Sequence, residues 1–140
     1  NRGYVWKRTL QLFGQLPVWK KIMGCGMGMF PSFFEAFHTE AMKQFGYYFV
    51  DAHNEVLQFL VTTGIIGCIS YFGMIITTLI KNLLFIRNKG ERERPENELS
   101  IIVPAILFVW LLQGLVNSPT VFITPYLFIF LGIGRNIVTE

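Results

Sequence analysis

Residues 56–80 form a run without a single charged side chain, interrupted only by Gln58, Ser70 and threonines among more apolar residues. A helix in water confines its apolar residues to one face, whereas a helix in lipid can be apolar on all sides over about 20 residues. Hydrophobic residues make up 52% of the whole chain, compared with roughly 45–50% in a soluble domain. We therefore predict an all-α membrane protein with a transmembrane helix over residues 56–80.

Two further apolar runs complete the predicted topology. Segment 81–99 interleaves basic and acidic residues, and the preference of Lys and Arg for short cytoplasmic loops places it in the cytoplasm. Runs 100–117 and 118–138 are the other two predicted transmembrane segments, the last including the C-terminus, and turn residues at Asn117 join them. Alternation across the membrane then places residues 1–55 and this turn outside the cytoplasm.

The first 55 residues carry more basic than acidic side chains, and we expect them to form a large, partly helical extracytoplasmic loop. The apolar spacing from Tyr4 to Leu16 predicts a short amphipathic helix that ends at Pro17. Cations are uncommon on this side of a membrane, and an anionic substrate such as a diphosphate would explain them. The candidate ligands are Arg2, whose planar guanidinium can bind two oxygens, with Lys7 and Arg8. The alternative is that these charges face water or lipid headgroups.

Two groups of glycines have spacings that favour close backbone approach. Gly24, Gly26 and Gly28 alternate with other residues, but their spacing matches neither nucleotide-binding glycine motif. We interpret them as a tight turn, with direct substrate contact as the alternative. Gly64 and Gly67 lie inside the predicted transmembrane helix, and we expect them to let a neighbouring helix approach closely.

His53 and Asn54 immediately precede the predicted transmembrane helix at its external end. The positive end of a helix favours anions and disfavours protonation of a nearby imidazole. A neutral histidine at such a place can accept a proton from an attacking hydroxyl. The alternative is a structural role, with His53 hydrogen-bonded to a backbone carbonyl and Asp51 capping the helix.

Several classes of function have no support in the sequence. Cys25 and Cys68 lie far apart in unlike surroundings, which argues against a disulfide or a metal pair, and no zinc-protease or serine-hydrolase motif is present. The net charge of +3 is spread among apolar runs and lacks the pattern of a nucleic-acid binder. The chain begins with Asn1 and no signal segment, so we expect a fragment that is inactive alone.

The motifs occur together in an order that resembles a known family. Asn1-Arg2-Gly3-Tyr4-Val5-Trp6, Pro17, Gly24-x-Gly26-x-Gly28-x-Phe30, Ala52-His53-Asn54 and Gly64-x-x-Gly67 are similar to the C-terminal region of the O-antigen ligase and polymerase superfamily. This superfamily also includes protein O-oligosaccharyltransferases. The motifs cover about residues 1–75, and the later helices agree only in hydropathy. The resemblance implies part of a polytopic helical bundle, related in fold to C-type glycosyltransferases, in the bacterial inner membrane.

The resemblance also implies an activity. Members of this kind are inverting glycosyltransferases of lipopolysaccharide biosynthesis that need no metal or other cofactor. The donor would be a glycan on undecaprenyl diphosphate, and the acceptor a hydroxyl of a glycan, lipid A-core or protein. Arg2 matches the family arginine that engages the diphosphate, and His53 the histidine at the reaction centre.

Two alternatives remain open within the superfamily. Ligases often carry Ser or Gln where this chain has Asn54, so polymerase and ligase are both expected possibilities. Some members are described as transport-related, and solute uptake or export is therefore the alternative function. A transporter uses ionisable residues near the midplane, and the three apolar runs contain none there.

Overall fold

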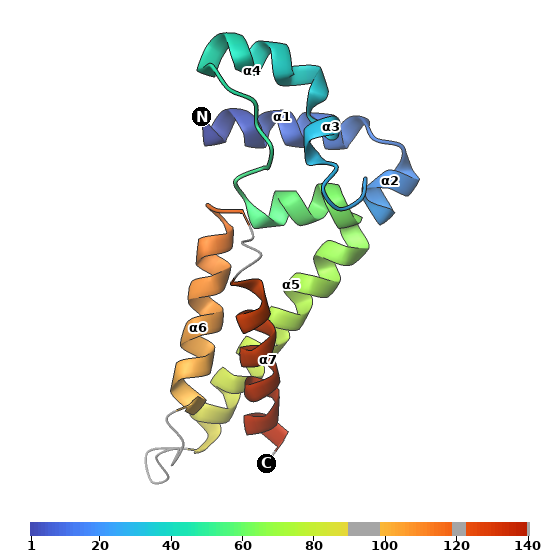
Figure 1. Cartoon of the computed structure of the whole chain (residues 1–140). Coiled ribbons are helices and arrows are strands. Elements are labelled where there is room, and N and C mark those ends of the chain that lie inside the picture. Colours follow the sequence, from blue (N-terminus) through green and yellow to red (C-terminus); the bar gives the residue numbers. More distant parts are fainter. Residues whose placement is uncertain (90–98, 119–122, 140) are drawn as a thin grey trace. The chain divides into compact units, whose positions relative to one another are not determined.

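A computed structural model describes residues 1–89, 99–118 and 123–139 (Figure 1). Within these ranges the chain forms helices and no β-strand, which confirms the all-α class. The helices are α1 (Arg2–Gln15), α2 (Val18–Met23), α3 (Phe30–Phe33), the 3-10 helix η1 (Glu35–Phe37), α4 (His38–Phe45), α5 (Glu55–Lys89), α6 (Leu99–Gly114) and α7 (Thr124–Thr139). The first 54 residues are therefore largely helical, and α1 ends shortly before Pro17, where the sequence predicts its end.

The first of two compact units comprises Asn1–Ser70 and Gly114–Ser118. Its core is rich in aromatic side chains, because α3, α4 and the segment before α5 all contribute to it. Phe34 is fully buried and lies 5.6 Å from Phe30 and 6.0 Å from Phe49 between ring centroids. The buried residues of this core are Val5, Phe30, Phe34, Ala41, Phe49, Ala52 and Val61. This core holds α1 against the segment that contains His53.

The helix α5 differs from the continuous span predicted over residues 56–80. It runs from Glu55 to Lys89, but Gly64 has φ 71° and ψ −172°, which no helical residue adopts, so the helix is broken there. It also extends into the predicted polar segment 81–99, where four consecutive apolar residues, Leu83 to Ile86, follow Lys81 and Asn82. Residues 90–98 of that segment lie outside the described residues.

The start of α5 is set by Asn54, and the alternative that Asp51 caps this helix is wrong. Asn54 Oδ1 accepts the backbone N–H of Leu57 at 2.9 Å, which is the bond of an N-cap side chain. Gln58 Oε1 in the first turn reaches back to accept the N–H of Ala52 at 3.0 Å. These two bonds satisfy backbone donors that no helical carbonyl can reach, so the chain enters the helix immediately after Asn54.

The second unit comprises Tyr71–Gln113 and Pro119–Glu140. Its buried apolar side chains come from the second part of α5, from α6 and from α7: Tyr71, Ile75, Leu79, Val103, Leu107, Leu127 and Leu131. The buried amide of Asn82 donates hydrogen bonds of 2.9 Å to the carbonyls of Thr78 and Gly134, which ties α5 to α7. Asn82 therefore fixes the contact between these two helices.

Among the described helices, Glu55–Asn88 is the stretch that is long and apolar enough to cross a membrane. The apolar helices α6 and α7 have 16 residues each, fewer than the about 20 that a perpendicular span requires. Most of run 100–117 and residues 124–138 of run 118–138 are helical, and their crossing of the membrane stays a prediction. Residues 119–122 of the last predicted run lie outside the described residues.

Candidate functional site

His53 lies in a strained backbone conformation next to the carboxylate of Asp51. Its φ of 48° is the one positive φ of a non-glycine residue in the described part of the chain. This left-handed conformation costs roughly 1–2 kcal/mol for an L-residue. Asp51 Oδ1 accepts the backbone N–H of His53 at 2.8 Å, which offsets the cost, and lies 3.0 Å from His53 Nδ1. The carboxylate therefore holds both the backbone and the imidazole of His53.

The same carboxylate oxygen accepts a second hydrogen bond, which comes from a distant part of the chain. Ser118 Oγ donates to Asp51 Oδ1 at 2.6 Å, and Asn54 Nδ2 donates to the carbonyl of Leu115 at 2.8 Å. Residues 114–118 at the end of α6 thus lie beside the start of α5 (Figure 1). Sequence reasoning assigned Asn117 and Ser118 only a turn. The signal that could have found Ser118 is the predicted topology, which places this turn on the same side as His53.

Arg2 is connected to this group of residues through Asn117. Its Nη2 donates to Asn117 Oδ1 at 3.4 Å, a long hydrogen bond that leaves most donors of the exposed guanidinium available. One helical turn later, Trp6 Nε1 donates to the carbonyl of Ala52 at 3.0 Å. Because residues four apart share a face of a helix, this bond holds the face that carries Arg2 against the segment before α5. Arg2 and His53, the two principal predicted site residues, therefore lie in the same unit and are connected through Asn117, Ser118 and Asp51.

Lys7 and Arg8 lie on other faces of α1 than Arg2 does. Successive residues of an α-helix are rotated by 100°, so Lys7 and Arg8 point about 120–140° away from Arg2 around α1. Arg8 is instead paired with Glu40 at 2.7 Å and lies over the Phe37 ring at 4.5 Å. The hydrogen bond from Arg8 to Glu40 raises the pKa of Arg8. The guanidinium of Arg8 therefore connects α1 to α4 through Glu40. Lys7 is exposed.

The loop that contains Gly24, Gly26 and Gly28 follows α2 and is called the glycine loop below. It contacts the break in α5. Cys25 N–H donates to the carbonyl of Val61 at 2.7 Å, and Gly26 N–H donates to that of Thr62 at 2.9 Å. The last carbonyls before the break would otherwise have no helical donor. The loop therefore caps the first part of α5 from outside the helix.

Gly24 and Gly64 make this approach possible. A Cβ at Gly24 would overlap the backbone of Thr62, and a Cβ at Gly64 would overlap that of Ile22. Their φ values of 83° and 71° also favour glycine. Gly64 thus permits close approach as predicted, here of the last turn of α2 at Ile22 and of Gly24 immediately after that helix.

The other predicted glycines have different surroundings. Gly26 and Gly28 adopt positive φ values of 107° and 74°, consistent with the interpretation of a tight turn. Gly67 faces its own helix, where a Cβ would overlap the side chain of Thr63. Gly67 therefore helps the helix to resume after the break.

Side-chain oxygen atoms of the protein itself lie at the N-terminus of α5, which is the positive end of the helix dipole. Asn54 Oδ1 takes one backbone donor, and the carboxylate of Glu55 in the first turn is only 2% exposed and packs against Gly114. An anion at this surface would therefore be recognised by Arg2 more than by the helix end. Within the described ranges no three His, Cys, Asp or Glu side chains are grouped as metal ligands.

Comparison with known proteins adds one match. A family model described as O-antigen ligase matches residues 1–72, just over half of the chain. The match contains Arg2, the glycine loop, His53 and the break at Gly64, and it ends before Ser118. No curated protein and no solved structure matches the chain.

Proposed function

The chain belongs to the O-antigen ligase family, and from this membership we propose that it transfers a glycan from undecaprenyl diphosphate to an acceptor hydroxyl. The acceptor would be a second glycan in a polymerase, or lipid A-core or protein in a ligase. The reaction would take place at the extracytoplasmic surface of the bacterial inner membrane. The observation that carries the proposal is the pair of Asp51 and His53, connected through Ser118 and Asn117 to Arg2.

His53 is the proposed general base. With Asp51 Oδ1 3.0 Å from Nδ1, the neutral imidazole keeps its proton on Nδ1 and presents Nε2 as an acceptor. The acceptor hydroxyl gives its proton to Nε2 while its oxygen forms a bond to the anomeric carbon of the donor sugar. Asp51 then stabilises the imidazolium, as a carboxylate does in other catalytic pairs that contain histidine.

Arg2 is the proposed ligand of the leaving group. The bond between the anomeric carbon and the diphosphate oxygen breaks on the side opposite to attack, which inverts the configuration. A guanidinium can hold two phosphate oxygens and stabilises the charge that develops on them. We propose that the reaction uses no metal ion, and that exposed Lys7 attracts the donor more weakly from its own face of α1.

The break in α5 bears on the transport alternative. Transporters use broken helices whose free backbone groups bind the substrate or a coupling ion. Here the carbonyls of Val61 and Thr62 accept the N–H groups of Cys25 and Gly26, so the break is closed by the protein itself. This internal closure supports the transferase over the transporter.

The proposal is tested with the purified full-length protein, an undecaprenyl-diphosphate glycan and an acceptor glycan. We expect His53→Ala to abolish consumption of the donor, while Lys43→Gln, a change at an exposed cation of α4, leaves it unchanged. Equal folding of both variants is verified by thermal unfolding. Normal turnover of the donor by folded His53→Ala protein would refute the proposal, as would solute uptake without any lipid-linked donor.

A further inference from the structure

α2 and the glycine loop form an apolar surface of the first unit. None of the residues of α2 is buried, and Val18 and Met23 are 70% and 65% exposed. The exposed large apolar side chains of this surface are Val18, Trp19, Ile22, Met23, Met27 and Met29. Contiguous apolar surface of this kind is rare on soluble proteins and marks contact with a partner or with a membrane.

The last turn of α2 lies against the break in α5. The carbonyl of Ile22 is so close to Gly64 that a Cβ on this glycine would overlap it. Directly after the break, α5 exposes Ile65, Ile66 and Ile69, which belong to the same unit as α2. The apolar surface of α2 therefore adjoins the apolar run of the helix that is long enough to cross a membrane.

The break also indicates the level of α2 relative to a membrane. The ribbon of α5 changes direction at Gly64 (Figure 1). Residues 65–89 continue as a helix of about 37 Å at 1.5 Å per residue, which exceeds the roughly 30 Å of the hydrocarbon core. The second part of α5 is therefore long enough to span a bilayer by itself. Gly64 would then lie where lipid meets water, and α2 would lie there with it.

The polar groups of α2 suit this boundary. Lys20 Nζ lies 5.4 Å from the centroid of the Trp19 ring, and Lys21 Nζ donates to the carbonyl of Gly14 at 2.7 Å. No acidic residue precedes Glu35 in the sequence, so α2 and the glycine loop carry only basic charged side chains. Tryptophan is enriched at membrane interfaces, and lysine stems can lie along apolar surface while their ammonium groups stay among polar headgroups.

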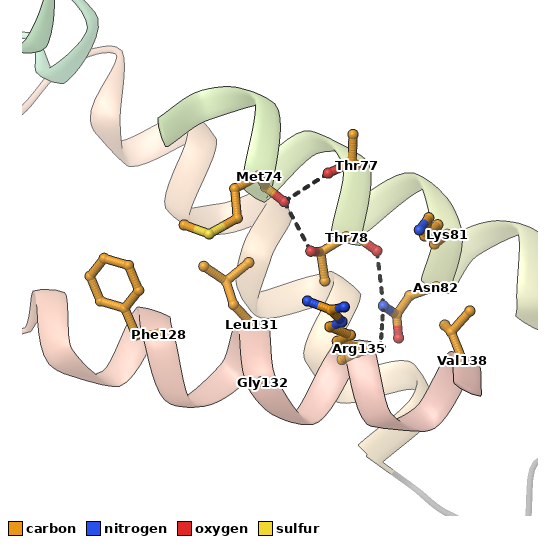
Figure 2. A pocket seen from close by; sticks show the side chains of 11 residues that line it. Met74, Thr77, Thr78, Lys81, Asn82, Phe128, Leu131, Gly132, Arg135 and Val138 are labelled. Carbon is orange, nitrogen blue, oxygen red and sulfur yellow. Dashed lines mark hydrogen bonds between the residues drawn. The ribbon is translucent and has the colours of Figure 1, made fainter. Parts of the chain in front are cut away.

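Apolar residues of the second unit have a different setting. Met74, Phe128 and Leu131 line a cavity of about 530 Å³ between α5 and α7 (Figure 2). They lie on helices that are apolar over most of their length, as expected of segments surrounded by lipid or by other helices. α2 lies outside every predicted span, so its apolar surface requires another explanation.

We propose that α2 and the glycine loop enter the lipid headgroup boundary as an interfacial anchor. Val18, Trp19 and Met23 contact acyl chains, and Lys20 contacts lipid phosphates. Interfacial segments of this kind bury their apolar face about 5–10 Å deep. The anchor rests on the membrane location of the family and not on the transferase reaction. If the proposed function also holds, the anchor keeps His53 and Arg2 near the depth of the diphosphate of a lipid-linked donor.

The test measures what surrounds Met23. A nitroxide is attached to Met23→Cys in full-length protein whose other cysteines are replaced by alanine, and the protein is placed in phospholipid nanodiscs. Electron paramagnetic resonance measures collisions of the label with oxygen, which concentrates in lipid, and with a nickel chelate, which stays in water. Lys43→Cys on α4 of the same unit is the matched control, because its side chain is exposed and should face water.

We expect the ratio of oxygen to nickel collisions to be several-fold higher at Met23 than at Lys43. Met27→Cys repeats the measurement in the glycine loop and should give the same result, should a label at Met23 prevent folding. A ratio equal to that at Lys43 would show that α2 lies in water, and low collision rates with both reagents would show that a protein segment covers it. Either result would overturn the proposal.

Failure of the anchor and failure of the proposed function are distinguishable. His53→Ala protein should keep the high collision ratio at Met23, because the anchor does not use the imidazole. Absence of glycosyl transfer together with a high ratio would refute only the proposed function. A low ratio in protein that still consumes the lipid-linked donor would refute only the anchor.

Discussion

Gly24 and Gly64 meet backbone to backbone, and neither position has room for a Cβ atom. The contact lies where α5 is broken, and the loop that follows Gly24 donates two hydrogen bonds to the carbonyls that the break leaves open. Because the first part of α5 begins at Glu55, two residues after His53, the glycine contact fixes the short helix that follows the candidate site. The stability of this contact can be tested apart from catalysis.

Gly64→Ala should destabilise the protein by about 2 kcal/mol or more, because it combines a positive φ with an overlap on rigid backbone. Gly73→Ala is the matched control, since Gly73 lies in the same helix and a Cβ there meets no atom within 4 Å. That change should be neutral or slightly stabilising, because alanine favours helices. Thermal unfolding in detergent measures both. Equal melting temperatures for the two variants would contradict the role of Gly64.

Asp51→Asn should lower the turnover number about 100-fold or more while the KM for the donor changes little. The amide cannot stabilise the imidazolium and no longer fixes the tautomer of His53. Glu35→Gln, which removes a carboxylate from an exposed site of the same unit, is the control and should keep full activity. Steady-state kinetics with the lipid-linked donor measures the turnover number and the KM of both variants. A normal turnover number in Asp51→Asn protein would show that the pair with His53 is structural only.

Ser118→Ala removes one of the two hydrogen bonds that Asp51 Oδ1 accepts within the described part of the chain, the other coming from the backbone N–H of His53. Since the loss of a single hydrogen bond is worth about 1 kcal/mol, we expect turnover to fall roughly fivefold. Ser118→Thr keeps the hydroxyl and should recover most of this loss. Failure of threonine to recover any activity, with both proteins equally folded, would place the effect in packing and not in the hydrogen bond.

Arg2→Ala should lower kcat/KM about 100- to 1,000-fold, the usual effect of removing one group that stabilises developing charge. Arg2→Lys should recover only part of this loss, because an ammonium group does not bind two oxygens in a plane. Lys7→Gln is the control on another face of α1 and should cost less than about tenfold. Equal losses for Arg2→Ala and Lys7→Gln would indicate general attraction of the donor in place of a specific contact.

Cys25 should react slowly with thiol reagents near neutral pH. Burial raises the pKa of its thiol above the ordinary value of 9.0, so the folded protein contains little thiolate there. For an acid whose pKa is raised by folding, the neutral form is favoured, and reactivity appears as the pH rises beyond 9. Mass mapping of iodoacetamide-labelled Cys25 between pH 7 and 10 measures the profile. A labelling rate of Cys25 at pH 8 equal to the rate in the denatured chain would contradict the raised pKa.

Much of the helical structure follows from local properties of the sequence. The charge-free run 56–80 is helical apart from the break at Gly64, because a helix satisfies the backbone of an apolar segment internally. Pro17 marks the end of α1 because proline cannot continue a helix. The site residues Arg2 and His53 were predicted from a resemblance in motif order, and the structure brings them into one unit. The residues that connect them, Asn117 and Ser118, have no local signal beyond that of a turn.

The sequence by itself therefore determined the helical class and the long apolar stretch, and it singled out Arg2 and His53 as candidate site residues. The tertiary structure decided that α5 breaks at Gly64, that Arg8 pairs with Glu40 and that Ser118 reaches Asp51. Hydropathy and helix propensity act between residues close in the chain, so a sequence displays them directly. A hydrogen bond between residues 51 and 118, or a contact between two distant glycines, exists only after the helices have packed and brought those atoms within bonding distance.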